Sequence, residues 1–296
     1  MYWRKAFGLA ILFIVLTPLT ALAWGPATHL KLATDLLEQL HLLPAALAIV
    51  VARHRKDFLF GNIAADVVVA KRLSRVKQVC HHWDTGFGLL EDARTDRAKA
   101  FVYGYLCHLA ADTVAHGKFI PRQMTLTRTT LSLGHLYWEM RADAAVETRY
   151  LCLLRHVLRD AAVEHRAMLH ARLTDTFLPF MMNWSVFYRT NRLASLRMWR
   201  RAVWQWGHLS RWRLPAELMR AYREECLERM VDILTNRREA RVCHEDPNGN
   251  AALAYARLQR RQLRQMARAG LIGPHVFHEA ARGHAPRTSG RYRMPA

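Results

Sequence analysis

Residues 108–116 read His-Leu-Ala-Ala-Asp-Thr-Val-Ala-His, which places a ligand-type side chain at every fourth position of an otherwise apolar stretch. In an α-helix each step of four advances a side chain by about 6 Å and rotates it by only ~40°, so His108, Asp112 and His116 project from one stripe. The surrounding residues 98–115 have an apolar helical pattern, and we expect the stripe to face the core. Imidazole nitrogen and carboxylate oxygen are common zinc ligands, so this stretch predicts a metal site on a buried helix.

A second pair repeats the spacing in His135-Leu-Tyr-Trp-Glu139. Two ligands one helical turn apart can bind the same ion without bending the backbone. Either pair alone is weak evidence, because the chain has 16 His and such pairs also form ordinary helix-surface contacts. Further ligand-type residues precede both pairs: His29 in Trp24-Gly-Pro-Ala-Thr-His29, then Asp66, then His81-His82-Trp83-Asp84.

Helical periodicity extends through most of the chain. Apolar residues recur at intervals of three and four from Leu30 to Leu40, with Thr28 placed as the N-cap and Pro44 beyond the end. Similar patterns cover residues 136–158, 163–173, 215–234 and 251–267, whereas 84–96 predicts a surface connection and 280–296 a frayed tail. Alternating strand patterns are scarce and no internal repeat is present, so we expect an all-α fold.

The N-terminus has the pattern of a secretory signal. Arg4 and Lys5 precede an uncharged apolar run over residues 7–22, and Ala21-Leu22-Ala23 offers small residues for cleavage. The run has 16 residues and contains a proline, whereas a spanning helix needs about 20, so an uncleaved anchor is the less favoured alternative. We therefore expect residues 1–23 to be removed on export to the periplasm or beyond, leaving Trp24 as the first residue.

Composition and charge limit the classes of protein and of partner. Of 296 residues, 51% are hydrophobic, which excludes wholesale disorder and allows a large core. The net charge is +20, divided as +6 over residues 1–143 and +14 over 144–296. Such an excess favours anionic partners, either a phospholipid surface or nucleic acid, although an Arg-rich codon bias is an equally simple explanation. We expect a helical domain over residues 24–240 and a basic helical extension with a flexible tail over 241–296; no protein partner is indicated.

Three other groups of residues have simpler interpretations. Four tryptophans among arginines suggest an interfacial helix, but they point in several directions, which favours core packing: Trp199, Trp204, Trp206 and Trp212. Five cysteines could form at most two disulfides, but buried apolar thiols are preferred: Cys80, Cys107, Cys152, Cys226 and Cys243. Seven histidines without partners at coherent spacing are expected on the surface or in the tail: His156, His165, His170, His244, His275, His278 and His284.

The order of the ligand-type residues resembles the zinc-dependent phospholipase C family over about residues 24–143. That family is an all-α bundle around three zinc ions, and its mature chain begins with a metal-binding Trp; the S1/P1-type nucleases share the arrangement. The spacing of four from Asp112 to His116 is two residues shorter than in the bacterial phospholipases C and the nucleases. It is more similar to the phospholipase domain of the glycosylphosphatidylinositol-specific phospholipase D.

The resemblance implies a role for each position. The amino nitrogen and carbonyl oxygen of Trp24 would hold one zinc with His29 and Asp112, while Asp66, His81, His108 and a shared Asp112 would hold the second. The third zinc would be bound by His116, His135 and Glu139. Asp66 is also the expected catalytic residue. His81 fits the family's His-x-aromatic-Asp pattern better than His82, which remains an alternative.

The resemblance therefore implies a three-zinc hydrolase that cleaves phospholipids or related phosphate diesters with metal-activated water, of the phospholipase C or D type. An S1/P1-like nuclease acting on single strands is the alternative within the hydrolases. A non-catalytic membrane-associated bundle that keeps zinc for stability is the alternative outside them.

Overall fold

The computed structural model describes residues 24–69, 74–75, 78–127, 131–160, 163–174, 176–196 and 212–286, with positions 201, 204, 205, 207 and 210. Every regular element in this part of the chain is helical, so the predicted all-α fold is confirmed. No helix among these residues is long and apolar enough to cross a membrane. The predicted signal segment and residues 287–296 lie outside the described residues.

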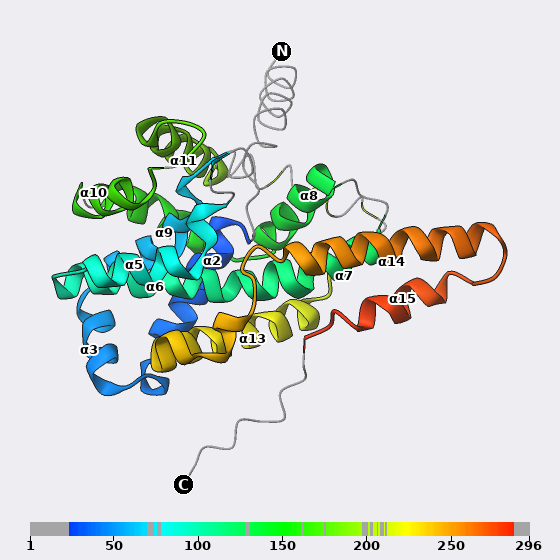
Figure 1. Cartoon of the computed structure of the whole chain (residues 1–296), viewed down its shortest axis with the longest axis horizontal. Helices are drawn as coiled ribbons and strands as arrows, with labels where there is room; N and C mark the ends of the chain where they lie inside the picture. Colours follow the sequence, from blue (N-terminus) through cyan, green and yellow to red (C-terminus); the bar gives the residue numbers. More distant parts are fainter. Residues whose placement is uncertain are drawn as a thin grey trace, which may run out of the picture.

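The longer helices follow one another along the chain (Figure 1). They are α2 (Pro26–Leu37), α3 (Ala45–Arg53), α4 (Arg55–Ala64), α5 (Trp83–Asp92), α6 (Asp96–Val114), α7 (Ile120–Leu126), α8 (Leu131–Ala144), α9 (Thr148–Arg159), α10 (Val163–Arg172), α11 (Phe180–Ala194), α13 (Ala216–Asn236), α14 (Asn250–Arg268) and α15 (His275–Arg282). Short elements that matter below are the single 3-10 turns η3 (Ala65–Val67), η5 (Val79–His81) and η8 (Arg241–His244), and the π-helical turn η6 (Ala115–Phe119).

Helix α6 is the centre of the bundle (Figure 1). It begins at a Thr95 N-cap, whose hydroxyl accepts a hydrogen bond from the Ala98 amide, and Asp96 places a negative charge in the first turn. Nearly all of its side chains are buried, since α2, α4, α5 and α13 pack around it. A helix that is covered on all sides explains why its sequence is apolar around the whole circumference except at the ligand-type positions.

Helix α4 crosses α6 at backbone contact because each helix has a glycine at the crossing. A Cβ on Gly61 would lie 1.9 Å from the Phe101 carbonyl oxygen, and a Cβ on Gly104 would lie 2.0 Å from the Phe58 carbonyl oxygen. No side chain fits at either position, so only glycine allows this approach. The crossing places the end of α4, and η3 after it, beside the ligand-type residues of α6.

Helices α14 and α15 form a hairpin that extends to one side of the bundle and packs along α7 (Figure 1). The segment before this hairpin, residues 245–248, contacts the region around His81 and Trp83 near α6. The Trp83 indole donates to the Glu245 carbonyl at 2.9 Å, and Asn248 Nδ2 donates to the His81 carbonyl at 3.2 Å. The division of the chain at residue 240 stays a prediction, but residues on both sides of it contact the same central region.

Three predicted boundaries were wrong. Residues 84–96 are not a surface connection: α5 occupies most of them and packs its Phe87 and Leu89 on α6 and its neighbours. The pattern over 136–158 is two helices rather than one, because the chain turns at residues 145–147 between α8 and α9. Thr28 is not an N-cap, since α2 already begins at Pro26 after an extended Gly25.

Several predictions for single side chains also need correction. His165 is fully buried and its Nε2 lies 2.6 Å from Asp57 Oδ1, so it is not a surface residue. The predicted tail contains the end of α15, and His284 is 9% exposed. Trp212 packs on the core as expected, but Trp204 is 54% exposed; Trp199 and Trp206 lie outside the described residues. All five cysteines are free thiols, of which three are buried and two partly exposed.

Candidate metal centre

Five of the predicted ligand residues meet in one buried group, which we call the inner group. His108 and Asp112 come from α6, His29 from α2, Asp66 from η3 and His81 from η5. All five are buried. Local sequence fixes each backbone position, but only the packing of α2, η3 and η5 around α6 brings the five side chains together.

Asp112 is the centre of the inner group. Its Oδ2 lies 3.1 Å from His81 Nε2 and 3.2 Å from His108 Nε2, and its Oδ1 lies 3.3 Å from His29 Nε2. The residue has no solvent exposure. In the part of the chain that the structure describes, neither carboxylate oxygen makes a hydrogen bond of good geometry.

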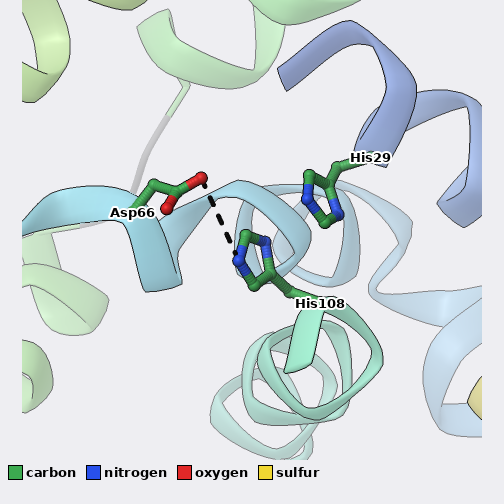
Figure 2. Close-up of side chains that lie close together, drawn as sticks. All are labelled: His29, Asp66 and His108. Atoms are coloured by element: carbon green, nitrogen blue, oxygen red, sulfur yellow. Dashed lines mark ion pairs between the residues drawn. The ribbon is translucent and has the colours of Figure 1, made fainter. Parts of the chain in front are cut away.

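The His108 ring is oriented by the end of α4. Its Nδ1 donates to the Asn62 carbonyl oxygen at 2.9 Å, which leaves the Nε2 lone pair directed into the group. This nitrogen lies 3.2 Å from His81 Nε2 and 4.0 Å from Asp66 Oδ2. Figure 2 shows Asp66 and His29 on opposite sides of His108, and the His29 and His108 rings stack at 3.9 Å.

Electrostatics favour the metal-binding protonation states. Burial raises the pKa of Asp112, but the surrounding imidazoles, His108 first among them, outweigh burial and hold this pKa well below its ordinary value. Burial, with a smaller contribution from His108, lowers the pKa of His29 below its ordinary value. A carboxylate anion and a neutral imidazole are the forms that can bind a cation.

The other three side-chain ligands form an outer group. His135 and Glu139 are one turn apart in α8, with His135 Nε2 at 2.9 Å from Glu139 Oε1. His116 belongs to the π-helical turn η6, and its ring packs edge-on against His135 at a centroid distance of 4.9 Å. His116 Nε2 lies 4.0 Å from Asp112 Oδ2, so Asp112 joins the outer group to the inner one.

Trp24 is buried beside these groups rather than exposed at a chain end. Its ring is 1% exposed and stacks on Phe119 of η6 at 4.7 Å. The start of α2 is fixed by Asp143 of α8, whose Oδ1 accepts hydrogen bonds from the Thr28 amide at 2.7 Å and the Thr28 hydroxyl at 3.0 Å. The same contact positions Trp24 and His29, which flank Thr28 in the chain.

The structure distinguishes the two adjacent histidines at positions 81 and 82. His81 is 2% exposed and lies against Asp112, whereas His82 is exposed to solvent at the start of α5. The carbonyl oxygen of His81 is held by Asn248, and its neighbour Cys80 accepts a hydrogen bond from the buried Tyr105 hydroxyl. The structure therefore places His81, and not His82, in the inner group.

Two supporting residues were missed by the sequence analysis. Asn248 anchors His81, and Gly249 packs on η6, where a Cβ would lie 2.3 Å from the His116 carbonyl oxygen. The Asp-Pro-Asn-Gly sequence at 246–249 is a recognisable turn signal. Nothing in that signal indicates that the turn lies against residues more than 130 positions earlier in the chain.

The inner group has the properties of a metal site. Two overlapping sets, His29–Asp66–His108 and His81–His108–Asp112, each have one potential ligand atom per residue within 4.8 Å of the others. Burying an aspartate without hydrogen bonds costs several kcal/mol unless a cation compensates it. Imidazole nitrogens and carboxylate oxygens are the donor set that zinc takes, so the residues present fit zinc. Such a site can bind the oxygens of a phosphate diester and supply a nucleophile at neutral pH.

Comparison with known protein families places this chain among zinc-dependent enzymes. A family model described as zinc-dependent phospholipase C matches residues 28–187, which is more than half of the chain. No curated protein and no solved structure shows significant similarity. The matched range contains every side chain of the inner and outer groups.

Proposed function

We propose that this chain, which belongs to the zinc-dependent phospholipase C family and is therefore a phospholipid-hydrolysing zinc enzyme, works with three bound zinc ions. The nine predicted ligands hold these ions. The observation that carries the proposal is the position of Asp112. Its buried carboxylate has one oxygen near His29 and the other near His81 and His108, and His116 of the outer group is 4.0 Å from it. A carboxylate in this position can offset the repulsion between neighbouring cations.

The proposed ligand sets follow the family pattern. Trp24 contributes its free amino group and carbonyl oxygen to the first zinc, together with His29 and Asp112. Asp66, His81, His108 and Asp112 bind the second. His116, His135 and Glu139 bind the third.

We assign the catalytic carboxylate to Asp66. When bound, zinc lowers the pKa of water to roughly 7 and polarises the phosphate oxygens. Asp66 is 6% exposed, whereas the other four members of the inner group are 0–2% exposed, so Asp66 is the least buried of the five. In the proposed reaction a carboxylate oxygen of Asp66 accepts the proton of the attacking water, while the Asn62 carbonyl keeps the His108 ring fixed through Nδ1.

We further propose that the protein is exported after cleavage at Ala23 and acts at an anionic phospholipid surface in the periplasm or outside the cell. The apolar run over residues 7–22 supports export, and the net charge of +20 supports an anionic partner. The nuclease alternative uses the same residues and makes nucleic acid the partner.

A substrate panel with a matched pair of variants tests the function. Zinc-loaded protein is assayed for phosphate-ester cleavage of phosphatidylcholine, phosphatidylinositol and single-stranded DNA. We expect hydrolysis of phospholipid, loss of at least about a hundredfold in His81→Ala, and little change in His82→Ala, since only His81 lies in the inner group. Cleavage of DNA alone would replace the proposal with the nuclease, and equal effects of the two substitutions would contradict the ligand assignment.

A further inference from the structure

Three large apolar side chains at the start of α11 project into solvent. Phe177 is 56% exposed, Met181 53% and Met182 52%, while Phe180 between them is buried. We call these three residues the apolar tip. Exposed apolar side chains that lie together are a feature of surfaces that bind membranes or other partners.

The chain that carries the apolar tip is rich in positive charge after Asp175. Residues 176–216 contain seven Arg, five Trp and no Asp or Glu. Four of these arginines are exposed in the described residues: Arg189, Arg192, Arg201 and Arg213. Arg189 and Arg192 belong to α11, the helix that begins at the tip. Guanidinium groups on the same helix as exposed apolar side chains complement a surface that has phosphate outside and hydrocarbon beneath.

Hydrogen bonds connect the apolar tip to the chain that follows Asp66. The buried Asn183 accepts from the Val69 amide at 3.0 Å through Oδ1, and its Nδ2 donates to the Leu178 carbonyl at 2.8 Å. The Phe177 amide donates to the Ser74 hydroxyl at 3.2 Å. The segment that carries the tip is thus attached, on both sides of Phe180, to the residues between η3 and η5.

Asp66 lies on an element that packs against α11. This element is η3, and Asp66 is the most exposed member of the inner group. A substrate that reaches the inner group from this side passes close to the segment that holds the apolar tip.

We propose that the apolar tip inserts into the surface of a phospholipid bilayer, with the neighbouring arginines on lipid phosphates, and so brings bilayer phospholipid to the Asp66 side of the metal centre. The inference rests on the proposed function, because it identifies the surface through which that site meets its substrate. It assigns a role to residues outside the predicted ligand set.

The test compares the triple variant Phe177→Ser, Met181→Ser, Met182→Ser with the wild type. A control variant carries Ile49→Ser and Val163→Ser, since these residues of α3 and α10 are equally exposed, at 58% and 70%, and lie on other helices. Each protein is sedimented with vesicles of phosphatidylcholine containing phosphatidylglycerol. Each is also assayed on those vesicles and on a short-chain phosphatidylcholine kept monomeric in solution.

We expect the triple variant to bind vesicles at least about tenfold more weakly and to lose vesicle hydrolysis in proportion, because three apolar side chains no longer leave water. Hydrolysis of the monomeric substrate and the zinc content should not change, since the apolar tip touches no ligand. The control variant should behave as the wild type. Phe177→Trp, which keeps a large apolar ring, should retain binding.

Unchanged vesicle binding by the triple variant would overturn the inference, and so would a loss seen only in the control variant. Binding of single-stranded DNA in place of vesicles would overturn it as well. Failure of the wild type to hydrolyse either lipid would instead refute the proposed function, while sedimentation would still report whether the apolar tip binds the bilayer.

Discussion

Asp112 is a buried carboxylate surrounded by imidazole groups. It sits on the central helix, has no solvent exposure, and lies within 3.3 Å of imidazole nitrogens from three other residues. An aspartate in this environment destabilises an apolar core unless opposite charge surrounds it. Cations bound between Asp112 and the histidines would turn that cost into cross-links between α6 and its neighbours, and metal binding would then be coupled to folding.

Asp112→Asn is therefore expected to remove activity and at least one zinc ion. The amide keeps the size of the side chain but loses the negative charge and one of the two oxygens available to cations. Metal analysis of the purified variant and an activity assay measure the two effects, and we expect activity to fall by at least about a hundredfold.

Asp84→Asn is the matched control for this substitution. The Asp84 side chain is 94% exposed and its contact is a 3.4 Å ion pair with Arg238 at the surface, so its loss should leave zinc and activity nearly unchanged. If both substitutions removed zinc equally, Asp112 would not be the bridging ligand.

At the scale of elements, the turn at 246–249 packs against the π-helical turn η6. The π turn joins α6 to α7 without a break in the helix and carries His116, which packs against His135 of α8. Gly249 packs directly on the backbone of His116 with a φ of +59°. Two separate features therefore require glycine at this position: the left-handed backbone and the close approach to His116.

Gly249→Ala should lower both stability and the occupancy of the outer group. A Cβ at this position meets the His116 carbonyl oxygen at 2.3 Å, so the π turn has to move and His116 with it. We expect a loss of about 3 kcal/mol or more in the free energy of unfolding, of which ~1 kcal/mol is backbone strain. Denaturant unfolding and zinc analysis report the two effects.

Gly270→Ala is the control that measures backbone strain without displacement of a neighbouring residue. Gly270 also has a positive φ, of +72°, but a Cβ there has no neighbour within 4 Å. Its substitution should cost only the backbone strain of ~1 kcal/mol and leave the zinc content unchanged. Equal losses in the two variants would show that the contact with His116 is unimportant.

For the molecule as a whole, the proposed processing of the chain determines whether the site is complete. The Trp24 ring is buried against Phe119 in the full-length chain, but only a cut before Trp24 gives a free amino group. An α-amine has a pKa near ~8, so nearby cations can keep it neutral and able to bind zinc. Its nitrogen and carbonyl oxygen then form a five-membered chelate ring.

Protein processed to Trp24 should accordingly hold one zinc more than protein that begins with an additional Met before Trp24, and should hydrolyse substrate faster. Mass analysis of the intact chain identifies the first residue, and metal analysis counts the ions. Full activity and equal zinc content in both forms would reduce Trp24 to a packing residue.

The sequence by itself determined the fold class and the metal-binding character of the chain. Apolar residues at intervals of three and four specify helices wherever they fall. His108 and Asp112 lie one turn apart by the geometry of a helix alone, and so do His135 and Glu139. Local periodicity did not resolve the break between α8 and α9, because residues 145–147, Ala-Val-Glu, contain no turn signal. It also missed helix α5, because that short helix contains several polar residues and two glycines.

Only the tertiary structure decided which distant residues meet. It selected His81 over His82, since the chain before α5 turns one imidazole toward Asp112 and the other to solvent. It also brought Asn248 to His81, buried His165 on Asp57, and tied the exposed residues of α11 to the segment after Asp66. The last three contacts join positions more than 100 residues apart, and no local preference of the backbone encodes them. They follow from close packing of the helices around α6, where Gly61 and Gly104 allow α4 to approach.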